Sequence, residues 1–152
     1  MPVDASLAGR TFPPTAPYDV TAERVAEFAA ATGTPYDDGD PAPATFPIVV
    51  AFAAMQELMA DPTVGIELHH VVHGEQRFAY ERPVRVGDRL TAELSVDSLR
   101  SIGGADIIGT TSAVRDAGGD LVCTARAVLV HKAPEDDAAD RPGDDTERGE
   151  QR

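Results

Sequence analysis

The hydrophobic pattern of the chain indicates two helices followed by a series of strands. Between Thr21, a good helix cap, and Gly33, a good helix stop, apolar residues recur at helical spacing. A denser apolar run covers residues 45–60, where Thr45 can cap a helix and Pro47 is tolerable only in its first turn. This run is shorter than the roughly 20 apolar residues needed to span a bilayer. A helix that is apolar on all sides is instead surrounded by protein, so we expect a buried central helix and no membrane partner.

The remainder of the chain follows the period of two that is typical of strands. In the first strand, Val72, Phe78 and Tyr80 share one parity and are expected on one face. The pattern predicts strands over residues 70–82, 90–97, 105–115 and 121–132, with turns at 83–88, 103–104 and 116–120. Strands of about a dozen residues exceed the usual 5–6, so the sheet should be strongly twisted and curved. A long curved antiparallel sheet wrapped around one apolar helix is the hot-dog architecture, of the α+β class.

Charge divides the chain into a domain and a tail. The 152 residues include 26 acidic and 13 basic side chains, for a formal charge of −13. Residues 133–152 hold eight of the acidic residues and three Arg, with nothing larger than Ala to seed a core. We expect residues 133–152 to be a disordered acidic tail and residues 1–132 to be a single hot-dog domain.

Composition also restricts the compartment and the partners. An acidic chain would be repelled by a phosphate backbone, which argues against nucleic-acid binding. A lone Cys123 and an opening segment without basic and apolar blocks favour a cytoplasmic location. The chain has no phosphate-binding loop and no nucleophile elbow, so we expect no cofactor.

Several segments resemble the MaoC-like hydratase/dehydratase superfamily, with the similarity running from about Tyr18 to Val130. The segments that carry it are Tyr18-Asp19-Val20, Ala42-Pro43-Ala44-Thr45-Phe46, Gly74-Glu75-Gln76-Arg77-Phe78 and, most specifically, residues 80–90. Within the superfamily the chain looks closest to actinobacterial subunits that resemble the N-terminal, non-catalytic half of (3R)-hydroxyacyl-ACP dehydratases.

The resemblance also indicates what is missing. Catalytic members resemble one another in an Asp and a His within a D-x-N-P-x-H pattern ahead of the central helix. Adding water to a 2-enoyl thioester needs a base for the water and an acid for C2. The most generous alignment of this chain places Asp40 at the Asn and Pro43 at the His, and proline cannot transfer a proton. The four His residues all lie elsewhere, so we expect no catalytic residue in this chain.

The resemblance implies a substrate-holding subunit of a (3R)-hydroxyacyl-thioester dehydratase in fatty-acid-type metabolism. A catalytic MaoC-like partner would supply the Asp and His, and the acyl thioester, on ACP or CoA, would lie between the two subunits. The candidates for the substrate groove are Thr45, Phe46, His70, His73, Phe78 and Tyr80. The sequence leaves open whether these residues line a groove or belong to the core.

Two other functions stay open. The chain could be a stand-alone homodimeric thioesterase or hydratase, for which Glu57 on the apolar helix is the candidate carboxylate and His70 an alternative group. It could also be a non-enzymatic module that binds acyl thioesters.

The histidine cluster at residues 69–73 raises the question of a metal site. In a strand His69 and His73 share a face and His70 points the opposite way, so the three side chains cannot converge on one ion. The sequence therefore predicts no metal site.

Overall fold

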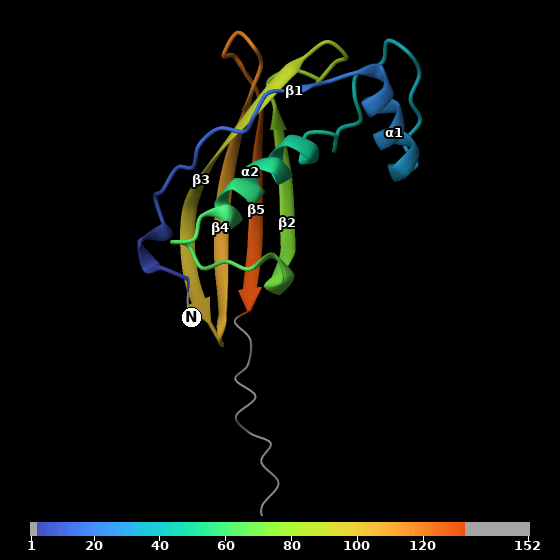
Figure 1. The fold of residues 1–152 in the computed structure, drawn as a ribbon. Coiled ribbons are helices and arrows are strands. Elements are labelled where there is room, and N and C mark those ends of the chain that lie inside the picture. Colours follow the sequence, from blue (N-terminus) through green and yellow to red (C-terminus); the bar gives the residue numbers. More distant parts are fainter. Residues whose placement is uncertain (1–2, 133–152) are drawn as a thin grey trace, which may run out of the picture.

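The computed structural model describes residues 3–132. The predicted acidic tail at 133–152 lies outside the described residues. The elements are η1 (Ala5–Leu7), β1 (Tyr18–Asp19), α1 (Ala22–Thr32), α2 (Ile48–Ala60), η2 (Leu68–His70), β2 (Val71–Tyr80), β3 (Arg89–Ile102), β4 (Ala105–Arg115) and β5 (Leu121–Lys132) (Figure 1).

The strands of the described region form one antiparallel sheet in the order β1-β3-β4-β5-β2. The sheet curves around α2, which lies across its concave face, and α1 projects beyond one end (Figure 1). This is the predicted α+β arrangement of a long curved sheet around one apolar helix. No helix of the described region has the length and hydrophobicity needed to cross a membrane.

The two helices begin for different reasons. At α1 the Thr21 hydroxyl accepts a hydrogen bond from the Arg24 N–H at 3.2 Å, and Gly33 ends the helix with φ of +66°, both as predicted. The expected cap of α2 by Thr45 is wrong, because the helix begins three residues later and its N-cap, Pro47, makes no side-chain bond. Turns over residues 43–49 lead directly into α2 and use main-chain carbonyls in place of a side-chain cap.

The core lies between one face of α2 and the concave face of the sheet. The buried residues of α2 are Val50, Ala51, Ala54, Met55 and Leu58. The expectation that α2 is surrounded on all sides is wrong for the single chain, since Phe52 is 40% exposed and Ile48 is only half-buried. A sheet covers one face of a helix, and the other face stays open unless another layer packs on it.

A β-bulge in β2 changes which residues face the core. The pairing with β5 runs His73 to Leu129 and then Glu75 to Val128, so Gly74 is the extra residue. Residues directly opposite in an antiparallel pair point to the same face, which places His73 beside buried Leu129 on the concave side. The predicted parity of Val72 with Phe78 is therefore wrong: Val72 lies on the opposite face and is 66% exposed.

Candidate functional site

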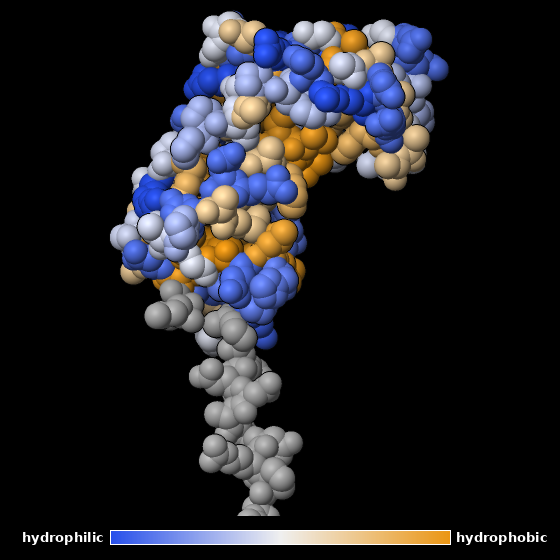
Figure 2. Space-filling model, in the orientation of Figure 1, coloured by the Kyte–Doolittle hydropathy of each residue, from blue (hydrophilic) through white to orange (hydrophobic). Residues whose placement is uncertain are grey.

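An open, mainly apolar groove of about 500 Å³ lies between α1, the start of α2 and β2. Figure 2 shows the molecule hollowed beside the projecting α1, with hydrophobic residues gathered in the hollow. The groove is lined by Phe28, Thr32, Thr45, Ile48, His73, Gln76 and Phe78. A hollow of this size and character suits an elongated apolar ligand.

The structure brings three of the sequence candidates together in this groove. Thr45, His73 and Phe78 all line it, and His73 does so because the bulge at Gly74 turns it to the concave side. Phe46 does not line the groove: it is 1% exposed, and its ring packs edge-on against Phe28 with 5.3 Å between centroids. Phe46 is therefore a core residue that supports a groove residue.

Sequence reasoning missed the contribution of α1. Phe28 and Thr32 lie four residues apart on one side of α1 and line the groove opposite β2. Their helical spacing predicted an apolar face, and the groove is where part of that face remains uncovered.

Tyr80 lies in a neighbouring pocket of about 390 Å³ further along β2, with Pro41, Ala42 and Ala44. Its hydroxyl donates a hydrogen bond to the Ala44 carbonyl. Partial burial raises the pKa of Tyr80, so the phenol stays protonated at neutral pH and can donate its hydrogen bond to Ala44. Tyr80 thus ties the loop before α2 to the edge strand that forms one wall of the groove.

The remaining sequence candidates lie outside the groove. Glu57 is exposed near the end of α2, about 13 Å along the helix axis from Ile48. His70 belongs to η2 at the far end of β2 and contacts Glu67. Neither side chain lines the groove with Thr45.

The loop that would carry the catalytic dyad in the superfamily forms an exposed turn here. Asp37, Asp38 and Asp40 are exposed, and the Asp40 carboxylate accepts a hydrogen bond from the Asp37 N–H at 3.0 Å. Pro43, which the most generous alignment places at the His, is buried. The loop therefore presents acids to solvent and none to the groove.

Among the described residues that line the groove, the imidazole of His73 is the one side chain suited to acid–base chemistry. His73 Nε2 lies 3.0 Å from the Gln76 side-chain oxygen, and no carboxylate is among the described residues that line the groove. The start of α2 could in principle stabilise an oxyanion with its free N–H groups. Here the N–H groups of Ile48 and Val49 already donate to the carbonyls of Thr45 and Phe46. The groove can hold an apolar chain, but it does not assemble an acid, a base and oxyanion donors.

The turn after Tyr80 is fixed by an ion-pair network. Arg82 donates to both carboxylate oxygens of Asp88, at 2.9 and 3.1 Å, and to Asp116 at 3.3 Å. Partial burial of Asp88 disfavours its charge, but the hydrogen bonds from Arg82 and from the Arg85 N–H outweigh this effect and lower the pKa of Asp88. The segment that carries the most specific resemblance, residues 80–90, therefore contains a bidentate Arg–Asp pair that closes its turn, and the bond from Arg82 to Asp116 joins this turn to the β4–β5 hairpin.

One edge of the sheet is open. Within residues 3–132, β2 pairs with β5 alone, so the main-chain groups along its other side face solvent beside the groove. An unpaired edge strand of ten residues is a ready template for pairing with another chain.

Comparison with solved structures identifies the class of this domain. The C-terminally truncated HadBC (3R-hydroxyacyl-ACP dehydratase) complex of Mycobacterium tuberculosis contains a chain that is 27% identical, with a TM-score of 0.72 over 82% of this chain and 96% of that one. A MaoC-like dehydratase is also 27% identical, with a TM-score of 0.69 over 84% of this chain but 43% of that longer one. The chain is thus a hot-dog domain related to the MaoC-like dehydratases, and the predicted fold is confirmed.

The sequence comparisons define the family. The chain belongs to the family described as FAS1-like, dehydratase domain region, whose model matches residues 6–125. A UPF0336 protein of Streptomyces avermitilis is 40% identical over 90% of this chain and 99% of its own length.

Proposed function

We propose that this chain is the substrate-holding subunit of a (3R)-hydroxyacyl-thioester dehydratase and pairs with a second hot-dog subunit that supplies the catalytic Asp and His. The observation that carries the proposal is a groove with apolar walls, a single imidazole and no lining carboxylate among the described residues. Similarity to a chain of the HadBC dehydratase complex supports it. So does the longer MaoC-like dehydratase, of which this chain covers 43%, because that length leaves room for a second domain of this size.

In this proposal the partner lies along the open side of β2 and closes the groove. The acyl chain packs against Phe28, Ile48 and Phe78, where burial contributes about 0.8 kcal/mol per methylene. The thioester end extends toward the partner, whose base removes the C2 proton and whose acid protonates the departing 3-hydroxyl group. This chain contributes binding and orientation, and the partner contributes proton transfer.

The alternatives make different use of the same molecule. A thioesterase or a homodimeric hydratase would act through Glu57 or His70, and neither residue reaches the groove. A binding module would use the groove in the same way but would need no catalytic partner.

Co-expression separates the three possibilities. The full chain is produced alone and together with the MaoC-like subunit from the same genome that retains Asp and His, and each preparation is assayed for hydration of a short enoyl-CoA and an enoyl-ACP. We expect a stable complex that hydrates the substrate and a single chain that does not.

If the chain alone matches the rate of the complex, the subunit proposal fails. If the chain alone cleaves acyl-CoA and Glu57→Ala abolishes this activity, the protein is a thioesterase. If the chain binds acyl-CoA and forms no complex, it is a binding module.

Filling the groove tests the substrate-holding role directly. In the purified complex, Thr45→Trp should lower kcat/KM for a long-chain enoyl thioester at least tenfold, about 1.4 kcal/mol or roughly two buried methylenes. A four-carbon substrate should be affected much less, because it does not reach the filled part. Ala117→Trp, on the exposed β4–β5 hairpin, is the control. Equal losses for both chain lengths would contradict the proposed groove.

A further inference from the structure

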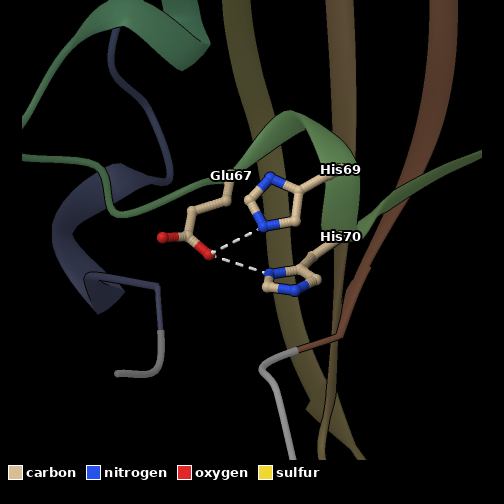
Figure 3. A group of neighbouring side chains, drawn as sticks. All are labelled: Glu67, His69 and His70. Carbon is tan, nitrogen blue, oxygen red and sulfur yellow. Dashed lines mark ion pairs between the residues drawn. The ribbon is translucent and has the colours of Figure 1, made fainter.

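The turn that enters β2 brings three metal-binding side chains together. Glu67 directly precedes η2, and His69 and His70 lie within it. The three potential ligand atoms all lie within 4.8 Å of one another. Figure 3 shows the Glu67 carboxylate facing both imidazole rings. The 3₁₀ turn is the reason: it aligns Glu67 with His70, three residues on, and sets His69 and His70 about 120° apart, whereas a strand would point them to opposite faces.

The two distances from the Glu67 carboxylate lie close to those between ligands of a shared ion. Oε2 of Glu67 lies 2.8 Å from His70 Nδ1 and 3.7 Å from His69 Nε2. Zinc binds nitrogen and carboxylate oxygen at about 2.0–2.2 Å, which places neighbouring ligand atoms about 3–3.5 Å apart.

The contact between Glu67 and His70 is an ion pair that lacks the geometry of a hydrogen bond (Figure 3). The Nδ1 atom of His70 is buried and has no hydrogen-bond partner in the described part of the chain, despite the short distance to Glu67. A carboxylate oxygen and an imidazole nitrogen this close together, with no hydrogen bond between them, can both bind one ion.

A buried neighbour holds the turn in place. The Glu67 N–H donates to Nε2 of His131, 3.3 Å away, and His131 is only 2% exposed. The His70 N–H donates to the Glu67 carbonyl at 2.9 Å, which closes the turn. The backbone that carries the ligands is therefore fixed from the core, as metal sites require of their supporting residues.

We propose that Glu67, His69 and His70 form a binding site for a divalent transition-metal ion of the Zn²⁺ type. Two imidazoles and one carboxylate favour such ions over Mg²⁺ and Ca²⁺, which prefer oxygen ligands. Three protein ligands leave a position for water or a further ligand. The strongly acidic chain attracts cations. The site lies outside the groove and does not depend on the proposed function; because β2 begins at the next residue, Val71, a bound ion would fix the start of the open edge strand.

Metal titration of the untagged full chain tests the site. Zn²⁺ alone is titrated in competition with a chromogenic chelator, and binding of one ion per chain is expected. His69→Ala, His70→Ala and Glu67→Gln should each weaken binding at least tenfold. His73→Ala is the matched control, because this exposed histidine lies on β2 next to Gln76 and should leave the Zn²⁺ affinity unchanged.

A spectroscopic measurement identifies the ligand atoms independently of affinity. In ¹⁵N NMR of the imidazoles, Zn²⁺ should shift Nε2 of His69 and Nδ1 of His70 and leave His73 in place. Circular dichroism of each variant checks that it is folded. Equal affinities for the His69, His70 and His73 variants, or binding at several sites without saturation at one ion per chain, would overturn the proposal. Displacement of Zn²⁺ by a large molar excess of Mg²⁺ would also overturn the proposal.

Discussion

At the scale of single residues, two ionisable side chains lie buried next to each other inside the domain, Asp106 and His131. Asp106 and His131 are 6% and 2% exposed and face each other across β4 and β5. Asp106 accepts hydrogen bonds from the Val3 N–H and the Ser101 hydroxyl. Nδ1 of His131 lies 3.9 Å from Asp106, beyond hydrogen-bond distance, and has no partner among the described residues.

His131 should make the protein less stable in mild acid. Burial lowers the pKa of His131, and the opposing attraction of Asp106 is weaker. Below the ordinary His pKa of about 6.5 the unfolded chain takes up a proton that the folded chain resists, so the free energy of unfolding decreases as the pH falls. Urea unfolding of wild type between pH 7 and 5.5, with EDTA present, should show a falling midpoint. His131→Gln keeps an acceptor near the Glu67 N–H and should show a smaller fall; identical pH profiles would refute this role.

At the scale of elements, the sequence predicts periodic segments well and single-residue irregularities badly. Thr21 and Gly33 mark the ends of α1, and the alternation around Leu90 marks β3, because caps and periods are local properties. The bulge at Gly74 shifts the period by one residue, which no count of alternating positions detects. That shift moves His73 into the groove.

The groove could be predicted only in part, because a single-residue bulge determines one of its residues and because it joins segments that are distant in the sequence. Thr45 and Phe78 lie in the segments that resemble the family, whereas Phe28 and Thr32 on α1 meet them only through the fold. The short 3₁₀ turn at residues 68–70 likewise reverses the expected divergence of His69 and His70.

A second bulge, in β3, places the Ser98 hydroxyl close to Gly109. The pairing of β3 with β4 shifts between Val96 and Ser98, and a Cβ on Gly109 would lie 2.6 Å from the Ser98 hydroxyl oxygen. Gly109→Ala should therefore cost about 1–2 kcal/mol of unfolding free energy through overpacking. Adding Ser98→Ala should recover most of the loss, and Gly74→Ala should cost less, because its Cβ comes no closer than 3.4 Å to another atom. A double-mutant cycle in urea measures the coupling, and additive effects would show that the contact is not the cause.

At the scale of the whole molecule, the domain leaves its groove, one face of α2 and one sheet edge uncovered. Val72 at the start of β2 is 66% exposed, Leu68 in the preceding η2 is 54% exposed, and Phe52 on α2 is 40% exposed. Natural proteins usually protect a long edge strand with charge, proline or a covering element. Here the start of the edge is apolar, which is the pattern expected of a surface that a partner covers.

A charge on the edge strand should block that partner without damaging the fold. Val72→Lys places a positive group on the exposed side of β2, where lysine is a typical protection against edge pairing. We expect the affinity for the co-expressed partner to fall at least tenfold, about 1.4 kcal/mol, while the melting temperature of the chain alone stays unchanged. Ile102→Lys is the matched control, because Ile102 is 57% exposed at the end of β3, three strands away from β2 in the sheet. Sedimentation analysis of the mixtures measures assembly. If both variants assemble like wild type, β2 is not the contact edge and the groove must be closed from another side.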